Sequence, residues 1–256
     1  MKEILRIKNV SLTYQTKDDE ITAIENLSFS CNEGDFISLI GPSGCGKTTV
    51  LSMIAGLLKP TSGQIILGND ENERFEVGYM LQKDHLFPWR TIESNVYLPL
   101  EIKKKKDKQH VEYANHLLEK YGLKDFRKKY PDQLSGGMRQ RVALIRTLVF
   151  NPKLLLLDEP FSALDSQTRL LVCNDVYDII KAEKKTAVLV THDISEAICM
   201  SDKVVILTER PGRVKKIIEL GFDKSLTPFE RRSQPIFSEY FNEIWRELSY
   251  AKNANQ

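Results

Sequence analysis

A glycine-rich segment that joins an apolar strand to a helix constrains this chain more than any other feature. Residues 36–40 are apolar or small, as expected of a buried β-strand. Residues 41–49 read Gly-Pro-Ser-Gly-Cys-Gly-Lys-Thr-Thr and fit the pattern G-x-x-x-x-G-K-[ST]. Residues 50–58 then place their apolar side chains on one helical face. This order of strand, loop and helix predicts a site that binds phosphate.

Each part of this loop supplies a contact that a phosphate needs. Glycines let the backbone curl so that several N–H groups point at one spot, and the helix N-terminus adds partial positive charge. We predict that Lys47 reaches the β- and γ-phosphates of a nucleotide and that the Thr48 hydroxyl binds Mg²⁺. The predicted nucleotide-binding residues of the loop are Gly41, Pro42, Ser43, Gly44, Cys45, Gly46, Lys47, Thr48 and Thr49.

The loop leaves two questions open. An ordinary glycine-rich turn is the alternative interpretation, and kinases, GTPases and motor ATPases all share the pattern. Cys45 lies near a helix N-terminus, where the pKa of a thiol tends to fall. We therefore expect alkylation of Cys45 to block ATP binding and ATP to protect it, the alternative being a merely tolerated small residue.

Length and composition fit one large α/β domain with a smaller lobe. The chain has 256 residues, 41% of them hydrophobic and 28% charged, and its net charge is +2. So weak a basic balance predicts no nucleic-acid partner. The chain lacks a run of about 18 apolar residues, so we expect no membrane span. Its charged start does not resemble a signal peptide, and its four scattered cysteines are typical of reduced thiols.

Two further apolar runs end in residues that carry chemistry. Residues 153–157 precede Asp158 and Glu159, and residues 186–190 precede Thr191 and His192. Because parallel strands end at the same edge of a sheet, these side chains are expected near the phosphate site. Asp158 would then bind Mg²⁺ through water, and Glu159 would act on the attacking water. Solvated acids and a structural histidine are the alternatives.

The remaining segments contain a helical region, a second possible anion site, an aromatic residue of uncertain role and an apolar stripe. Residues 91–150 show helical periodicity without strand signals, with helices expected near 92–99, 107–121 and 141–149. Ser135-Gly136-Gly137, just before the last of these helices, is a second possible anion site. Tyr14 is either a simple strand aromatic or a platform for a purine. In the helical tail, an apolar stripe predicts core packing: Phe237, Tyr240, Phe241, Ile244, Trp245 and Leu248.

Taken together, these motifs resemble the ATP-binding subunits of ABC transporters over nearly the whole chain. Residues 41–48 match the Walker A motif, Gln82 the Q-loop and residues 134–140 the signature motif. Residues 154–158 followed by Glu159 match Walker B and its catalytic glutamate. The family's D-loop, switch histidine and adenine-stacking aromatic correspond to residues 162–165, His192 and Tyr14. Each motif is weak alone, but six in the family's order are specific.

The resemblance implies an α/β fold of the P-loop NTPase type, with a mainly parallel core sheet, an N-terminal antiparallel β part and an inserted helical subdomain. The expected divisions are a catalytic core (1–84 and 151–225), a helical subdomain (85–150) and a C-terminal helix (226–256). The implied activity is ATP hydrolysis with ATP and Mg²⁺. The residues expected to take part in catalysis are Glu159, His192, Lys47, Gln82, Ser135 and Gly137, and the expected Mg²⁺ ligands are Thr48, Gln82 and Asp158.

The resemblance also implies partners and a location. A second copy of the chain would form a head-to-tail dimer, in which Ser135 and Gly137 of one copy close on the ATP of the other. Transmembrane permease subunits would bind the loop at 83–95, a solute-binding protein would act indirectly, and the chain would sit peripherally on the cytoplasmic face of the membrane. Residues 86–96 and 209–213 are similar to those of nitrate, sulfonate and taurine importers.

Two other readings remain open at this stage. A soluble ABC protein of translation or repair usually has two cassettes or a long inserted coiled coil, and this chain has neither. A free small-molecule kinase is disfavoured by residues 134–140. The short tail makes regulation of the kind found in maltose importers doubtful.

Overall fold

The computed structural model describes residues 2–15, 19–68 and 76–253, with the side chains of 250–253 excepted. Its core sheet has six strands in the order β5-β6-β7-β3-β8-β9, and all neighbouring pairs are parallel except β8 with β9. The strands are β3 (Phe36–Ile40), β5 (Val77–Met80), β6 (Leu154–Asp158), β7 (Thr186–Val190), β8 (Lys203–Leu207) and β9 (Val214–Glu219). A mainly parallel core sheet was expected and is confirmed.

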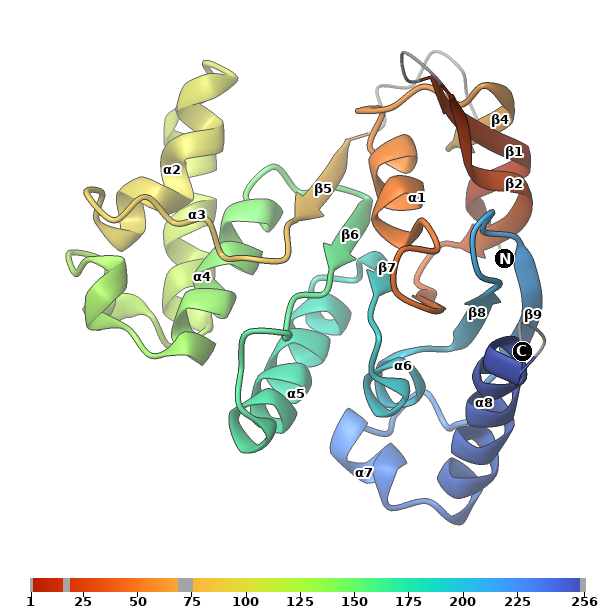
Figure 1. Ribbon diagram of the computed structural model, residues 1–256. Helices are drawn as coiled ribbons and strands as arrows, with labels where there is room; N and C mark the ends of the chain where they lie inside the picture. Colours follow the sequence, from red (N-terminus) through yellow and green to blue (C-terminus); the bar gives the residue numbers. More distant parts are fainter. Residues whose placement is uncertain (1, 16–18, 69–75, 254–256) are drawn as a thin grey trace.

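A second sheet is antiparallel and comes from the N-terminal part of the chain. Its order is β2-β1-β4, with β1 (Glu3–Gln15), β2 (Glu20–Asn32) and β4 (Ser62–Leu67). Figure 1 shows this small sheet beside α1 (Lys47–Ile54), on the side of the molecule away from α2–α4. The antiparallel N-terminal part of the predicted fold is therefore confirmed as well.

The other helices fall into a group inserted between β5 and β6 and a set that follows β6. Between β5 and β6 the chain forms only helices and two short 3₁₀ turns, which gather at the left of Figure 1. These are α2 (Ile92–Ile102), α3 (Lys108–Lys120), the turns η1 (Lys124–Phe126) and η2 (Pro131–Gln133), and α4 (Gly136–Leu148). The remaining helices are α5 (Ser166–Ala182), α6 (Ile194–Met200), α7 (Pro228–Arg232) and α8 (Pro235–Asn253).

The core strands are buried on both faces, which explains their nearly continuous apolar sequences. In β6, Leu154 and Leu156 pack with α1 and the small sheet, whereas Leu155 and Leu157 pack with α4 and α5. All four leucines are fully buried. Successive side chains of a strand point to opposite faces, so one run of leucines fixes the sheet between two separate hydrophobic clusters.

Two helices differ from the predicted bounds for identifiable reasons. The helix after the glycine loop was expected at 50–58 but spans Lys47–Ile54, because Gly56 turns into the left-handed conformation (φ +72°) and ends it. The helix expected at 141–149 begins earlier, at Gly136. The Ser135 side chain caps it by accepting a hydrogen bond from the Met138 N–H (3.3 Å). Packing against α5 offsets the low helix propensity of the glycines.

The apolar stripe of the tail packs as predicted except at one residue. Ile244 is fully buried against α6 and the edge of the sheet, and Phe237, Tyr240, Phe241 and Leu248 pack around it. Trp245 was expected in this core but is 57% exposed, and its ring stacks on Phe241 with centroids 6.4 Å apart.

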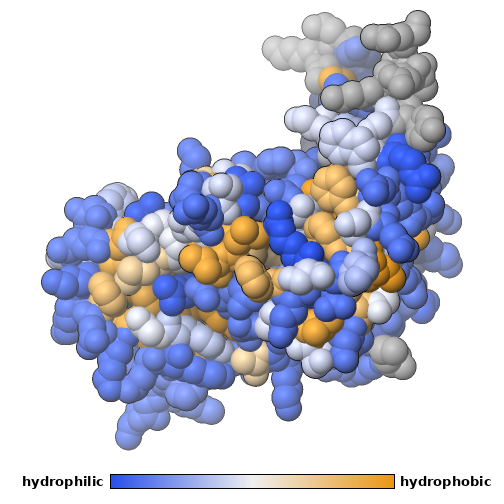
Figure 2. All heavy atoms as spheres, turned by 90° about the horizontal axis from the view of Figure 1, so that it is seen from below, coloured by the Kyte–Doolittle hydropathy of each residue, from blue (hydrophilic) through white to orange (hydrophobic). Residues whose placement is uncertain are grey.

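The face seen from below in Figure 1 is largely hydrophilic with separate apolar patches (Figure 2). Helices α5 and α7 lie at this end of the molecule, and their exposed apolar side chains are Leu170, Leu171 and Phe229. Among the described residues, no helix combines the length and the apolar composition that crossing a membrane requires.

Candidate nucleotide-binding and hydrolysis site

The ends of three neighbouring parallel strands converge on one pocket of about 430 Å³. The glycine loop follows β3, Glu159 follows β6 and His192 follows β7. The pocket is lined by Ser43, Gly44, Gly46, Lys47, Thr48, Thr49, Glu159 and His192. Residues predicted from three separate stretches of sequence therefore share one site, because a parallel sheet brings the carboxyl ends of its strands to the same edge.

The glycine loop closes around the Lys47 side chain. Its Nζ donates to the carbonyl oxygens of Gly41 (2.8 Å) and Pro42 (2.9 Å), and Lys47 is only 7% exposed. Gly46 caps α1 with φ +98°, and a Cβ there would approach Ile24 Cδ1 to 2.6 Å. Glycine is thus required both by the backbone angle and by the packing. Gly46, Thr48 and Thr49, at the start of α1, line the same pocket as the lysine, and a helix leaves its first N–H groups without partners inside the helix.

Cys45 does not behave as predicted. Its side chain is 1% exposed, and burial raises the pKa of the thiol even though the Lys47 ammonium opposes that shift. A buried neutral thiol is a poor nucleophile. The expected fall of the thiol pKa is therefore wrong, and Cys45 packs inside the loop; protection of Cys45 by ATP stays a prediction.

Asp158 is joined to the loop by a short polar chain. The Thr48 hydroxyl donates to Asp158 Oδ1 (3.0 Å), and the Tyr79 hydroxyl donates to Asp158 Oδ2 (3.3 Å). Burial raises the pKa of the Asp158 carboxyl, and these two hydrogen bonds oppose the shift. Tyr79 lies on β5 and was missed in the sequence, where nothing distinguishes it from any other strand aromatic.

We expect Tyr79→Phe to lower ATPase activity by at least about tenfold, because a hydrogen bond to a charged group contributes about 1.5–3 kcal/mol and this one holds Asp158 in place. Steady-state ATPase assays at saturating Mg²⁺ would measure the change. Tyr130→Phe is the control, since Tyr130 is exposed and its hydroxyl makes no hydrogen bond among the described residues. Equal activity of both variants would exclude a positioning role for Tyr79.

Glu159 is held by two of the predicted site residues. Gln82 Nε2 donates to Glu159 Oε2 (3.2 Å), and His192 Nδ1 lies 3.2 Å from the same oxygen. The Glu159 backbone adopts a left-handed conformation (φ +44°), and its N–H donates to Val190 O (2.8 Å) at the end of β7. Such a conformation is uncommon for a residue other than glycine and carries a cost in free energy, here at a residue that lines the pocket.

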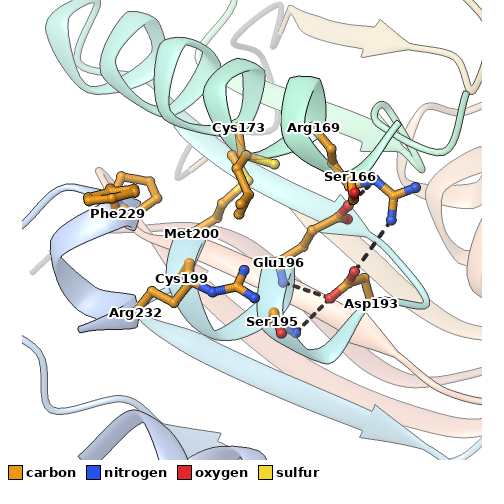
Figure 3. A pocket seen from close by; sticks show the side chains of 12 residues that line it. Ser166, Arg169, Cys173, Asp193, Ser195, Glu196, Cys199, Met200, Phe229 and Arg232 are labelled. Atoms are coloured by element: carbon orange, nitrogen blue, oxygen red, sulfur yellow. Dashed lines mark hydrogen bonds and ion pairs between the residues drawn. The ribbon is translucent and has the colours of Figure 1, made fainter. Parts of the chain in front are cut away.

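A polar cluster behind His192 connects α5 with α6. Figure 3 shows Arg169 reaching from α5 toward Asp193 and Glu196. The Arg169 guanidinium lies 3.5 Å from Asp193 Oδ2 and 3.7 Å from Glu196 Oε1, and the Thr191 hydroxyl donates to Glu196 Oε2 (2.5 Å). Glu196 is 8% exposed. Burial raises its pKa to about 7, and Asp193 adds to the rise, whereas Thr191, Arg169 and His192 oppose it.

This raised pKa predicts how stability depends on pH. Between about pH 4.5 and 7 the folded Glu196 holds a proton that the unfolded chain has lost, so its contribution to the free energy of unfolding falls as pH rises. Glu196→Gln removes this pH-dependent contribution to the free energy of unfolding. We therefore expect the variant to be more stable than wild type by up to about 3 kcal/mol at pH 8, with no difference near pH 4.5. Urea unfolding of both proteins between pH 4.5 and 8 would measure this difference in stability.

The exposed residue Glu239 on α8 gives the matched control for this measurement. We expect Glu239→Gln to follow the wild-type pH dependence throughout. A parallel shift of the Glu196→Gln curve at every pH would contradict the prediction.

The loop that follows Gln82 is tied down by buried polar contacts. The fully buried Asn95 side chain accepts from Phe87 N–H and donates to the carbonyls of Phe87, Arg90 and Thr91. Arg146 of α4 donates to the carbonyl of His85 (2.8 Å). Phe87 and Trp89 remain exposed at the loop surface, with ring centroids 5.0 Å apart. The loop is therefore a firm platform that presents aromatic side chains.

Several predicted site residues do not line the pocket. Gly41, Pro42, Cys45, Gln82 and Asp158 belong to the glycine loop or contact residues that line the pocket, whereas Ser135, Gly137 and Tyr14 have no such contact among the interactions described above. Ser135 and Gly137 are at the start of α4, where a Cβ on Gly137 would approach Val172 Cγ2 to 2.7 Å, and neither lines the pocket. Tyr14 is 40% exposed on β1 and also does not line it. Among the described residues, no group of three or more histidine, cysteine or acidic side chains is placed to hold a metal ion.

A glycine loop between a parallel strand and a helix, with acids at the end of another parallel strand two places away in the same sheet, defines a P-loop nucleotide-binding protein. Comparisons with known proteins narrow the class. The family model described as ABC transporter matches residues 24–162. An uncharacterized ABC transporter ATP-binding protein of Bacillus subtilis is 48% identical over 248 residues, which cover 96% of this chain and 95% of that protein.

Two further similar proteins belong to the same class of ATP-binding subunits and cassettes. An aliphatic sulfonates import ATP-binding protein of Bacillus cereus is 39% identical and covers 94% of this chain and 93% of its own length. A solved dimeric ATP-binding cassette in a post-hydrolysis state, bound to ADP and phosphate, is 34% identical with a TM-score of 0.70, covering 86% of this chain and 100% of that chain. The chain therefore belongs to the ABC transporter family, as its motifs predicted, and it is an ATP-binding subunit that hydrolyses ATP.

Proposed function

We propose that this chain powers the import of a small, anionic nutrient such as a sulfonate, taurine or nitrate. Support comes from the aliphatic sulfonates import proteins of Bacillus, which are about 40% identical over most of the chain, and from the importer-like segments 86–96 and 209–213. In this proposal the catalytic core is 1–84 with 151–225, the helical subdomain is 85–150, and 226–256 is a C-terminal helical part.

The contacts of Glu159 carry the proposed mechanism of hydrolysis. Its Oε2 lies within hydrogen-bond distance of both Gln82 and His192 and faces the phosphate loop. Glu159 acts as general base toward the attacking water. His192 orders that water and contacts the γ-phosphate, Lys47 and the loop N–H groups hold the phosphates, and Tyr14 stacks on the adenine.

Mg²⁺ fits the side chains beside the loop. Thr48 and Asp158 offer a hydroxyl and a carboxylate oxygen 3.0 Å apart, and Gln82 adds an amide oxygen. These are hard oxygen ligands, and Mg²⁺ typically takes only one or two protein ligands with phosphates and waters completing the shell. When bound, the ion offsets negative charge on the phosphates.

A second copy of the chain completes the site. Ser135 and Gly137 lie at the N-terminus of α4, outside their own chain's pocket, and such a terminus favours phosphate. In the proposed head-to-tail dimer they close on the γ-phosphate of the partner's ATP. The dimeric relative with ADP and phosphate supports this arrangement. ATP therefore forms part of the interface, and its binding shifts the population toward the closed dimer.

The loop at 83–95 provides a surface for a membrane partner. Phe87 and Trp89 are exposed on a backbone that Asn95 holds rigid. We place a helix of a transmembrane permease on this surface, which puts the chain peripherally on the cytoplasmic face of the membrane. A solute-binding protein would deliver the nutrient to the permease from the other side.

Affinity purification of the chain from detergent-solubilised native membranes would test the import proposal. A stoichiometric multi-spanning protein is the expected companion, and sulfonates, taurine and nitrate could then be screened for stimulation of ATPase activity in the presence of the solute-binding protein. Recovery of the chain with ribosomes, nucleic acid or no partner would overturn the proposal. It would favour a soluble ABC ATPase that is not coupled to transport.

A further inference from the structure

The turn between β8 and β9, residues 208–213, has no role in the proposed mechanism of hydrolysis. It contains the segment 209–213 that is similar to importer sequences. Its Gly212 N–H donates to Ala23 O (2.9 Å), and the Glu25 N–H donates to Gly212 O (3.0 Å). Both partners belong to β2. The backbone of the turn is therefore joined to the antiparallel sheet.

Gly212 also lies directly against the glycine loop of the nucleotide site. A Cβ on Gly212 would lie 2.2 Å from Cys45 O and 3.4 Å from Cys45 C. These two distances differ by the full length of a C=O bond, about 1.2 Å, so the Cys45 carbonyl points almost straight at the place where that Cβ would be. Only glycine leaves room for a carbonyl in this direction.

The direction of the Cys45 carbonyl also sets the direction of the next N–H group. In a trans peptide the C=O and the N–H lie in one plane and point to opposite sides. Because the Cys45 carbonyl points toward Gly212, the Gly46 N–H points away from it. Gly46 lines the nucleotide pocket. One peptide unit thus faces the turn with its carbonyl and carries, on its other side, an N–H of the kind that binds phosphate.

Side-chain contacts hold the turn in a fixed position. Inside the turn, the Thr208 hydroxyl donates to Pro211 O (3.0 Å) and accepts from the Arg213 N–H (2.9 Å). On the outside, the Arg213 guanidinium lies 2.6 Å from Glu25 Oε2, an ion pair that reaches back to β2. The turn is therefore a firm support behind the glycine loop.

We infer that Gly212 is a positioning residue for nucleotide binding, because it lets the Cys45–Gly46 peptide direct the Gly46 N–H toward the phosphates. The inference rests on the proposed role of the glycine loop in holding those phosphates. A side chain at position 212 would push the Cys45 carbonyl aside, and a peptide unit that rotates takes its N–H with it. The obstacle is a backbone oxygen, which cannot swing away as the end of a flexible side chain can.

Calorimetric titration of the full-length chain with Mg²⁺ADP tests this role, since ADP is not hydrolysed and carries the phosphates that the loop N–H groups cradle. We expect Gly212→Ala to raise the Kd of ADP by about tenfold or more, because small misplacements of binding groups have large effects. Circular dichroism would establish that the variant is folded at the temperature of the titration. A residue with only a structural role would lower stability and leave the Kd of the folded protein unchanged.

Gly221→Ala is the matched control. A Cβ on Gly221 meets only the Tyr240 hydroxyl, at the ordinary contact distance of 3.4 Å. This variant should bind ADP with the wild-type Kd. A folded Gly212→Ala variant that binds ADP as tightly as Gly221→Ala would overturn the inference.

Two variants of Thr208 test the turn without introducing a clash. Thr208→Val keeps the shape of the side chain but loses its hydroxyl, so we expect the Kd of ADP to rise about two- to tenfold. Thr208→Ser keeps the hydroxyl and should restore wild-type affinity. Equal affinity of the two variants would show that the turn does not position the glycine loop, which also overturns the inference.

Lys47→Ala separates this inference from the proposed function. Loss of ADP binding in Lys47→Ala, together with wild-type affinity in Gly212→Ala, would overturn the role of Gly212 alone. Wild-type affinity in Lys47→Ala would instead contradict the proposed phosphate site in the glycine loop, and the inference would fall with it.

Discussion

Glu159→Gln is expected to lower the ATP turnover number by about 100- to 1,000-fold or more while leaving ATP affinity close to wild type, because a general base contributes roughly 10²–10⁴-fold. The amide has the shape of the carboxylate and keeps an oxygen that Gln82 can reach, but it cannot accept a proton from water at neutral pH. With ATP bound and not hydrolysed, the closed dimer should accumulate.

Single-turnover ATPase assays, nucleotide-binding titrations and size-exclusion chromatography with Mg²⁺ATP would measure these three effects. Glu112→Gln is the matched control, because Glu112 is a 65% exposed acid on α3 and should behave as wild type. Loss of nucleotide binding in Glu159→Gln, or turnover near that of the control, would count against Glu159 as the base.

The second large effect concerns Arg231, which joins α7 to the body of the protein. The residue is 1% exposed, and its guanidinium donates to Ser201 O (2.8 Å), Cys199 O (3.3 Å) and Tyr177 Oη (2.9 Å). It also lies 3.9 Å from Asp202 Oδ1. Arg231→Ala leaves these buried acceptors without a donor and opens a cavity, so we expect the free energy of unfolding to fall by about 3–5 kcal/mol.

Chemical denaturation followed by circular dichroism would measure this loss. Arg232→Ala changes the neighbouring exposed arginine and should shift stability by less than about 0.5 kcal/mol. Arg231→Lys should fall between the two, since a lysine keeps the charge but loses the planar fork of donors. If all three variants unfold like wild type, α7 does not depend on the buried guanidinium.

The contrast between Glu159 and Arg231 shows what the sequence could predict. Glu159 follows a buried strand, so its place at the site follows from local pattern and from the geometry of parallel sheets. Arg231 and Tyr79 act through partners that lie far away in the chain, and neither position has a periodicity or motif that marks it. The prediction that Trp245 is buried is wrong for a related reason. The apolar stripe of α8 is wider than the core it packs against, so the side chain at one edge of the stripe stays in solvent.

The early start of α4 and the raised thiol pKa of Cys45 have a different cause. Glycine weakens an isolated helix, and a helix N-terminus acidifies an exposed thiol, but both rules assume that the surroundings are solvent. In the folded chain, Leu164 packs on Gly136, α5 packs on Gly137, and the glycine loop covers the sulfur. Tertiary burial therefore overrides the local preference in both cases.

The left-handed backbone at Glu159 bears on any attempt to engineer this protein. A residue with a Cβ in that conformation costs on the order of 1 kcal/mol or more relative to glycine, and the cost is carried at the residue proposed to perform the chemistry. A library selected only for heat resistance would therefore favour glycine or asparagine at this position. The more thermostable variants selected in this way would no longer hydrolyse ATP. Thermal screening must therefore be paired with an assay of ATP turnover.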